Sequence, residues 1–254
     1  MSDPLDQLRK AARQLIETDQ AMAGEFIPTG VNPLPEIDLP QQQDMGDEQA
    51  PAPEMAVEDK AAALEKMDVE EVRGCTKCAL SRSRTNTVFG EGNSDADLVF
   101  VGEAPGQEED RTGKPFVGRA GQLLDKMIAA MGLGRDDVFI CNILKCRPPN
   151  NRTPAAEEVE ACWNYLVRQL QIIRPKVIVT LGNPATQTLL DTRTGITRLR
   201  GQWQKLPLLD EGLSGIDVMP TYHPAYLLRQ YTVENRRKVW EDLKKVMDRL
   251  NLSD

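Results

Sequence analysis

The sequence predicts an α/β fold in which a mostly parallel four-stranded sheet is covered on both faces by helices. Two observations support this prediction. Short apolar runs of strand length alternate with amphipathic helical patterns along residues 71–254. The intervening helical patterns are long enough for the crossover connections that parallel strands require. The 254-residue chain shows no internal repeat that would indicate a solenoid or propeller.

The expected elements follow one another in a regular order. Gly132 and Gly134 stop the helix expected over residues 119–131. Thr153 caps the helix that follows, which has Pro154 at its first position. The expected strands cover residues 98–102, 137–143, 176–182 and 217–222, and the expected helices cover residues 119–131, 154–173, 184–190 and 234–250.

The first quarter of the chain has a different composition. We expect an amphipathic helix within residues 1–24, from Asp3 to Met22, followed by a flexible acidic linker over residues 25–70 that contains six prolines. A short helix-like stretch, Ala61 to Val69, leads into the main domain, residues 71–254. Two interpretations of the helix from Asp3 to Met22 remain open: a loose appendage, or a docking element for a protein partner.

The charge is divided unevenly along the chain. Residues 1–70 hold 16 acids and 5 bases, whereas residues 71–254 hold 23 acids and 26 bases, a net charge of +3. The overall charge of −8 therefore does not exclude binding of a polyanion by the main domain. No apolar run approaches the roughly 18 residues of a membrane helix, and the MSDPLDQLRK start lacks the pattern of a secretory signal. We expect an intracellular, cytoplasmic protein.

Four of the five cysteines have a spacing that suggests metal binding. Cys75 and Cys78 have two residues between them, and Cys146 and Cys162 have fifteen. Disulfides are not expected in a reducing compartment. The four thiols would suit either a tetrahedral zinc ion or an iron–sulfur cluster, and spacing alone does not decide between them. Cys141 lies in an apolar strand, where we expect it to pack in the core.

Three segments are too polar and irregular for core packing: residues 102–110, 113–121 and 221–229. In an open parallel sheet the working residues gather at the carboxyl ends of the strands. Gly102, Glu103, Asn142 and His223 should therefore meet at one edge. His223 is the only histidine of the chain, and its position after a strand and before a proline leaves a structural and a catalytic role equally open.

The main domain contains four motifs, GEAPGQEED, KPFVGRAGQLL, NILKCRPPNNRTP and TYHPAYLLR. These motifs resemble those of the family 4 uracil-DNA glycosylases, iron–sulfur enzymes of base-excision repair. They occur in the family's order, and the resemblance extends from about residue 75 to the C-terminus. The resemblance implies a three-layer α/β/α fold. It also implies a 4Fe–4S cluster held by Cys75, Cys78, Cys146 and Cys162, and an activity that flips uracil out of DNA and hydrolyses its N-glycosidic bond, leaving an abasic site.

The resemblance also assigns roles to the pocket residues. Asn142 would read the edge of uracil with one donor and one acceptor, and Phe116 would stack on the flipped base. His223 would donate a hydrogen bond to the carbonyl oxygen next to the breaking bond. Gly102, Glu103 and Ala104 would line the pocket. Without the family, a strand cap for Asn142 and ordinary loop burial for Phe116 would be the simpler interpretations.

The group that activates water is less well defined by the motifs. Sister families have an aspartate at the position of Ala104, so the nearest carboxylates here are those of Glu103 and Glu109. We expect either Glu103 or a water molecule held by the backbone to supply the nucleophile.

Several residues beside the polar loops are candidates for contacts with uracil-containing DNA, single- or double-stranded. Leu227 corresponds to the wedge that fills the vacated base stack in sister families, although a buried leucine in a short helix is an equal alternative. The candidates for phosphate contacts, each of which could instead be a solvated surface charge, are Arg119, Arg147, Arg152 and Arg229.

Two other classes of function fit parts of the sequence. A non-catalytic iron–sulfur protein that binds DNA or acts as a scaffold would keep the fold without the activity, and a redox carrier would need no base-reading pocket. The presence of Asn142, Phe116 and His223 favours the enzyme. We expect a monomer that associates with the nucleoid when it acts on DNA.

Overall fold

The computed structural model describes residues 56–207 and 213–252, which belong to one compact unit, Pro51–Asp254. The helix expected between Asp3 and Met22 lies outside the described residues, as does most of the expected linker. Within the described ranges, no helix has the length and apolar character needed to cross a membrane.

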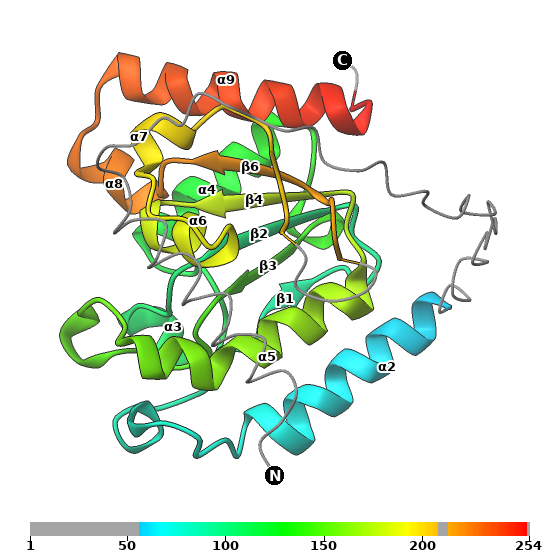
Figure 1. Cartoon of the computed structure of the whole chain (residues 1–254), viewed down its shortest axis with the longest axis vertical. Helices are drawn as coiled ribbons and strands as arrows, with labels where there is room; N and C mark the ends of the chain where they lie inside the picture. The colour runs from blue at the N-terminus through cyan, green and yellow to red at the C-terminus, as the bar shows by residue number, and fades with distance from the viewer. Residues whose placement is uncertain (1–55, 208–212, 253–254) are drawn as a thin grey trace, which may run out of the picture. The chain divides into compact units, whose positions relative to one another are not determined.

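Four parallel strands form the centre of the sheet and lie side by side in the order β3-β2-β4-β6 (Figure 1). They are β2 (Leu98–Gly102), β3 (Phe139–Asn142), β4 (Val177–Leu181) and β6 (Asp217–Thr221). Two antiparallel two-residue strands close the edges, β1 (Glu91–Gly92) beside β3 and β5 (Gln204–Lys205) beside β6. The four parallel strands confirm the sequence prediction, whereas a two-residue strand has no periodicity that could have predicted the edges.

Each face of the sheet packs against its own set of helices. In β2, Val99 and Val101 belong to one hydrophobic core, and Leu98 and Phe100 to the other, because successive side chains of a strand point to opposite faces. The first core contains residues from α2 (Val57–Met67), α5 (Ala156–Ile173) and α6 (Asn183–Leu189). The second contains residues from α4 (Arg119–Ala130), α8 (Pro224–Arg229) and α9 (Val233–Leu250). The three-layer α/β/α arrangement is therefore confirmed.

The start of α5 differs from its prediction. The helix begins at Ala156, with Ala155 at the N-cap, instead of following a Thr153 cap. The side chain of Glu158 accepts a hydrogen bond from the Ala155 backbone N–H (2.9 Å) and is itself paired with Arg152. A glutamate reaching back to the cap replaces the expected threonine hydroxyl.

The domain begins earlier than residue 71, which corrects the expected boundary. Helix α2 and the π-helical turn Asp68–Val72 precede the first cysteine, and Leu64 and Met67 are buried in the same core as α5. Lys60 is also buried, and its Nζ donates to the Ile173 carbonyl (3.2 Å). The prediction of a linker up to residue 70 is therefore wrong for residues 57–70, which form α2 and the start of the π-helical turn. The helix-like stretch expected from Ala61 to Val69 is confirmed there.

The carboxyl ends of the parallel strands face one edge of the sheet, on the side where α3 (Gln107–Thr112) and α8 lie (left in Figure 1). Short elements complete the connections: helix α7 (Ile196–Leu199) and three 3₁₀ turns at Ala79–Arg82, Arg135–Asp137 and Pro149–Asn151. This edge carries the polar loops that the sequence singled out.

Candidate active site

The pairing of β2 with β3 places Gly102 directly beside Asn142. A Cβ atom on Gly102 would lie 2.3 Å from the Asn142 Oδ1 atom and 2.7 Å from Cζ of Phe116. Glycine is therefore required here, because any side chain would displace the carboxamide or the ring. These three residues, all named by the sequence, therefore lie against one another at the candidate base site.

Asn142 is buried with one polar atom unpaired. The residue is 2% exposed, and its Oδ1 has no hydrogen-bond partner among the described residues. A buried unpaired oxygen is uncommon in proteins and costs stability, so it marks a position where a ligand donor fits. The carboxamide thus offers a free acceptor that the surrounding protein shields from bulk solvent.

Phe116 adopts the left-handed backbone conformation, with φ at 51°. Its ring centroid lies 5.7 Å from that of His223, and the two ring planes are inclined by 31°. The side chain is 6% exposed. A non-glycine residue in this conformation is held by its surroundings, which here consist of two oppositely charged groups.

The first of these groups is Glu109 on α3. Its Oε1 accepts the backbone N–H groups of Val117 (2.9 Å) and Gly118 (2.8 Å), just before α4 begins. The second group is Arg135, which donates to the carbonyl oxygens of Pro115 (2.7 Å) and Phe116 (3.1 Å). The loop that carries the ring is therefore bonded on both sides, and Glu109 acts as a loop support.

His223 forms the N-cap of α8, and its Nδ1 accepts a hydrogen bond from the Ala225 N–H (3.0 Å). In the neutral ring the proton then resides on Nε2. Burial, and secondarily the charge of Arg229, lowers the pKa of His223 to about 4, so the imidazole is neutral near pH 7. Gly182, with φ at +89°, makes room for it: a Cβ there would lie 2.9 Å from the His223 Cβ.

Glu103 follows the β2 strand and is half-buried. Its backbone carbonyl accepts the Leu144 N–H (3.1 Å), which ties the two strand ends together. Burial raises the pKa of the Glu103 carboxyl above its ordinary value. Glu103 and Glu109 were the two carboxylates considered for activating water. Because the Glu109 side chain supports a loop, Glu103 is the one that remains available. The neighbouring Ala104 has no acidic group.

The four spaced cysteines line one cavity at the carboxyl end of β3. The space within this cavity that the centre of a water-sized sphere can occupy is about 10 Å³. In the described ranges, no group of three or more His, Cys, Asp or Glu side chains is placed to hold a metal ion. The cysteines of the cavity are Cys75, Cys78, Cys146 and Cys162.

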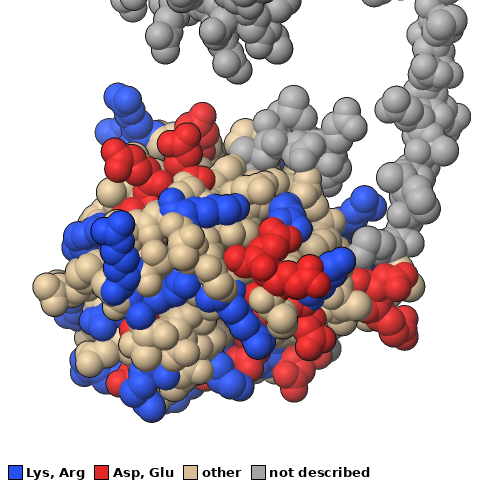
Figure 2. Space-filling view, turned by 90° about the horizontal axis from the view of Figure 1, so that it is seen from below, with Lys and Arg blue, Asp and Glu red and all other residues tan. Residues whose placement is uncertain are grey.

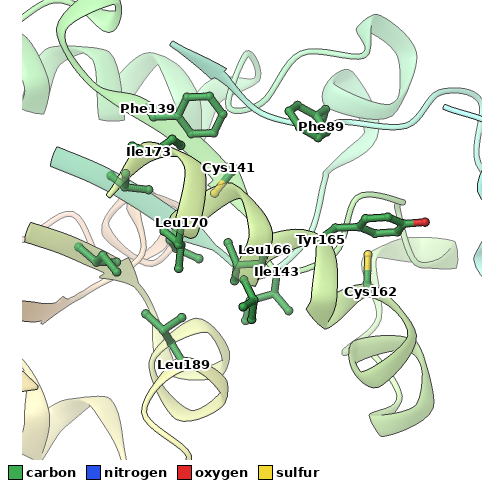
Figure 3. Packing of buried hydrophobic residues seen from close by; sticks show 14 of the residues in the cluster. Phe89, Phe139, Cys141, Ile143, Cys162, Tyr165, Leu166, Leu170, Ile173 and Leu189 are labelled. Carbon is green, nitrogen blue, oxygen red and sulfur yellow. The ribbon is translucent and has the colours of Figure 1, made fainter. Parts of the chain in front are cut away.

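The thiols in this cavity receive hydrogen bonds from nearby donors. Arg84 donates to the Cys146 Sγ (3.2 Å), and the backbone N–H of Lys145 donates to the Cys162 Sγ (3.2 Å). Burial raises the pKa of Cys146 to about 11, so its thiol stays protonated unless a cation binds it. Cys141 lies apart, packed near Phe139 in the core (Figure 3), which confirms its predicted packing role.

Comparison with known proteins identifies the family. A model of the Uracil DNA glycosylase superfamily matches residues 89–244. The chain is 52% identical over 177 residues to a type-4 uracil-DNA glycosylase of Thermotoga maritima, an alignment that covers 69% of this chain and 89% of the relative. It is 49% identical over 189 residues to the type-4 enzyme of Archaeoglobus fulgidus, covering 72% and 92% of the two chains.

This chain belongs to the type-4 uracil-DNA glycosylases. The described elements from β2 to α9 fall within or beside the matched range, whereas α2 precedes it.

The arginines proposed to contact DNA have different surroundings. Arg119 and Arg229 are exposed and form no ion pair within the described ranges. Arg152 is paired with the buried Glu158 (2.6 Å), and Arg147 donates to the Asn151 Oδ1 (2.7 Å). The first two have free guanidinium groups for phosphate, whereas a phosphate contact by either of the others would compete with an internal bond.

The proposed wedge residue is buried. Leu227 is 2% exposed and belongs to the core beneath α8, which supports the alternative of a packing leucine. Leu228, the next residue, is 42% exposed. The helical turn of α8 directs successive side chains to different sides, so a shift of one position exchanges core for solvent.

Sequence reasoning missed the residues that support the pocket from behind. Arg135 lies 19 positions after Phe116, whose carbonyl it bonds, and Glu109 lies eight positions before Val117. No periodic pattern connects such pairs. Both residues carry charge beside a glycine-containing loop. This pattern indicates a functional site, but it does not indicate which residue each charged side chain bonds.

The single histidine allows a direct test of the pocket's electrostatics. We expect nitrogen NMR of the folded protein to show the Nε2–H form and a midpoint near pH 4, well below the ordinary value of about 6.5. Since the unfolded state would take up the proton first, His223 should destabilise the fold as the pH falls from about 6.5 to 4. A midpoint near 6.5 in the folded protein would contradict this picture.

Proposed function

We propose that this glycosylase binds a uracil nucleotide flipped out of DNA and hydrolyses its N-glycosidic bond, leaving an abasic site. The observation that carries the proposal is the unpaired, buried Oδ1 of Asn142 beside the Phe116 ring. Uracil presents an N–H donor between two carbonyl acceptors, so its ring N–H would satisfy this oxygen.

The same atom explains discrimination against cytosine. Cytosine has an unprotonated ring nitrogen where uracil has the N–H, so it would leave the Asn142 Oδ1 unpaired and set an amino group against the carboxamide N–H. An unsatisfied buried group costs about 1–3 kcal/mol. The stacked Phe116 ring adds an attraction of about 1–3 kcal/mol that is shared by all bases.

His223 is placed to assist departure of the base. As the bond between the sugar C1′ and uracil N1 breaks, the electron pair leaves with uracil, and negative charge develops on its carbonyl oxygens. The Nε2–H of a neutral imidazole would donate to the oxygen next to the breaking bond without transferring its proton. The Ala225 N–H fixes the tautomer that makes this donation.

Glu103 is the side chain that we propose to orient the attacking water. Water adds to the cation-like sugar carbon and loses one proton, so a carboxylate with a raised pKa is a suitable acceptor. The requirement is modest, because a dissociative reaction tolerates a weak nucleophile.

Charge and an exposed apolar side chain support binding of DNA. Lys and Arg side chains gather over the left and lower parts of the face in Figure 2, with Asp and Glu toward its upper edge and right side. Arg119 and Arg229 are free for phosphate contacts. We propose Leu228, in place of the buried Leu227, as the side chain that fills the vacated stack.

We also propose that Cys75, Cys78, Cys146 and Cys162 hold a 4Fe–4S cluster. Their cavity joins the segment before β1, the end of β3 and α5, and its N–H donors are directed at sulfur, as thiolate ligands favour. When bound, the cluster would cross-link these segments. No step of the reaction requires it to change its oxidation state.

Excision of uracil is tested with an oligonucleotide that contains one uracil, followed by alkaline cleavage of abasic sites. We expect the protein to excise uracil under single-turnover conditions, and His223→Ala to slow excision by about 10²–10³-fold, the usual loss for one transition-state donor. Binding of the uracil strand without excision by the unaltered protein would instead support a non-catalytic DNA-binding role.

The cluster is tested by comparing two buried cysteines. Cys146→Ser should lose the bound iron and sulfide and the visible absorbance, whereas Cys141→Ser, in the core between β3 and α5, should retain them. Iron and sulfide assays on the purified full-length proteins distinguish the two. Equal metal content in both variants would refute the assignment of Cys146.

The wedge is tested by comparing two exposed apolar residues. Leu228→Ala should reduce excision from duplex DNA by about tenfold and have less effect on single-stranded DNA, in which no stacked pair must be opened. Val69→Ala, on the turn after α2, should change neither rate. An equal loss on both substrates would indicate a different role for Leu228.

A further inference from the structure

Lys145 is a buried lysine between the base pocket and the cysteine cavity. It is 1% exposed, three residues after Asn142 and directly before Cys146. Lysine is rarely buried without partners, because the desolvation of its amine opposes folding. Its position at the end of β3 therefore requires an explanation beyond packing.

The amine connects two segments by short hydrogen bonds. Its Nζ donates to the Asn142 carbonyl (2.7 Å) and to the Gln169 Oε1 on α5 (2.6 Å). Gln169 is fully buried, and its Nε2 donates onward to the Phe89 carbonyl (2.9 Å). The neighbouring Val88 N–H donates back to the Lys145 carbonyl (2.8 Å). The end of β3 is thus fastened to α5 and to the segment before β1.

These bonds act on the peptide that carries the base-reading side chain. The Asn142 residue is the last of β3, and the next N–H, that of Ile143, donates to the Gly102 carbonyl (3.0 Å). The Asn142 carbonyl points to the opposite side of that peptide, where it accepts the hydrogen bond from the Lys145 Nζ. Without this donor the peptide could rotate, and the carboxamide would move with it. The contacts need only N–H donors, which a lysine amine offers whether or not it is charged.

We propose that Lys145, supported by Gln169, is a positioning residue that holds the Asn142 carboxamide in register with the uracil edge. The proposal deepens the proposed function and rests on it. Lys145 does not touch the substrate. It increases the preference of the protein for DNA that contains uracil over DNA that lacks a base at that position, because an unsupported carboxamide would lose its fixed direction.

A second buried lysine provides a matched control. Lys60 is 3% exposed, and its Nζ likewise donates to a backbone carbonyl, that of Ile173, at the far end of α5. Lys60 also pairs with Asp95 and contacts no pocket residue. Lys60→Met and Lys145→Met therefore remove the same buried amine, with only the second acting on Asn142.

The measurement is the affinity of the full-length protein for DNA with a non-cleavable 2′-fluoro-deoxyuridine, divided by its affinity for the same DNA with a tetrahydrofuran abasic analogue. We expect Lys145→Met to lower this ratio by about tenfold or more, since small misplacements of a polar group have effects of this order or larger. Lys60→Met should leave the ratio unchanged. Melting temperature and visible absorbance report folding and cluster content for each variant.

Gln169 keeps the test decisive if Lys145→Met does not fold. Gln169→Met removes the second acceptor of Nζ and should lower the ratio by about threefold. Gln169→Glu, like Gln169→Met, loses the donor to the Phe89 carbonyl, but it retains the acceptor of Nζ and should preserve the ratio. An unchanged ratio in folded Lys145→Met, or in Gln169→Met, would overturn the proposal. An unaltered protein that does not prefer the uracil analogue would refute the proposed function itself, before any variant is compared.

Discussion

The pocket depends on one backbone pairing, the parallel register that sets Gly102 of β2 beside Asn142 of β3. The volume that a side chain would fill at Gly102 is occupied by the Asn142 carboxamide and the edge of the Phe116 ring. A slip of this register would replace Asn142 by a core residue of β3, because neighbouring strand residues point to opposite faces. The pairing of β2 with β3 at the centre of the sheet therefore sets the position of the Asn142 carboxamide.

Charged groups behind the pocket hold its backbone, while the working side chains keep one polar atom free. Glu109 and Arg135 bond the loop of Phe116, and Lys145 bonds the carbonyl of Asn142. The Ala225 N–H occupies one nitrogen of His223 and leaves the other available. Unpaired and buried polar atoms lower the stability of the fold, but these groups are already oriented when a base binds.

Much of the fold could be predicted from the sequence, because each strand and long helix carries a local pattern. The strand over residues 98–102 and the helix from Arg119 match their predictions closely. The cap at Thr153 and the boundary at residue 71 were wrong, since both depend on side chains that act over distance: Glu158 on Ala155, and Met67 on α5. The positions of Asn142 and His223 after strands predicted that they meet at one edge of the sheet, whereas Phe116 and the roles of all three came only from resemblance to a family.

The sequence by itself determined the chemical types at the strand ends: a carboxamide, an aromatic ring, one imidazole and four spaced thiols. These follow from residue identity and from periodicity, which are local. Only the tertiary structure decided which atoms meet and which stay unpaired, the tautomer of His223, and the burial of Leu227 beside an exposed Leu228. Those outcomes arise from packing between segments distant in the chain, such as Lys145 with Gln169, and no local pattern encodes the relative position of two such segments.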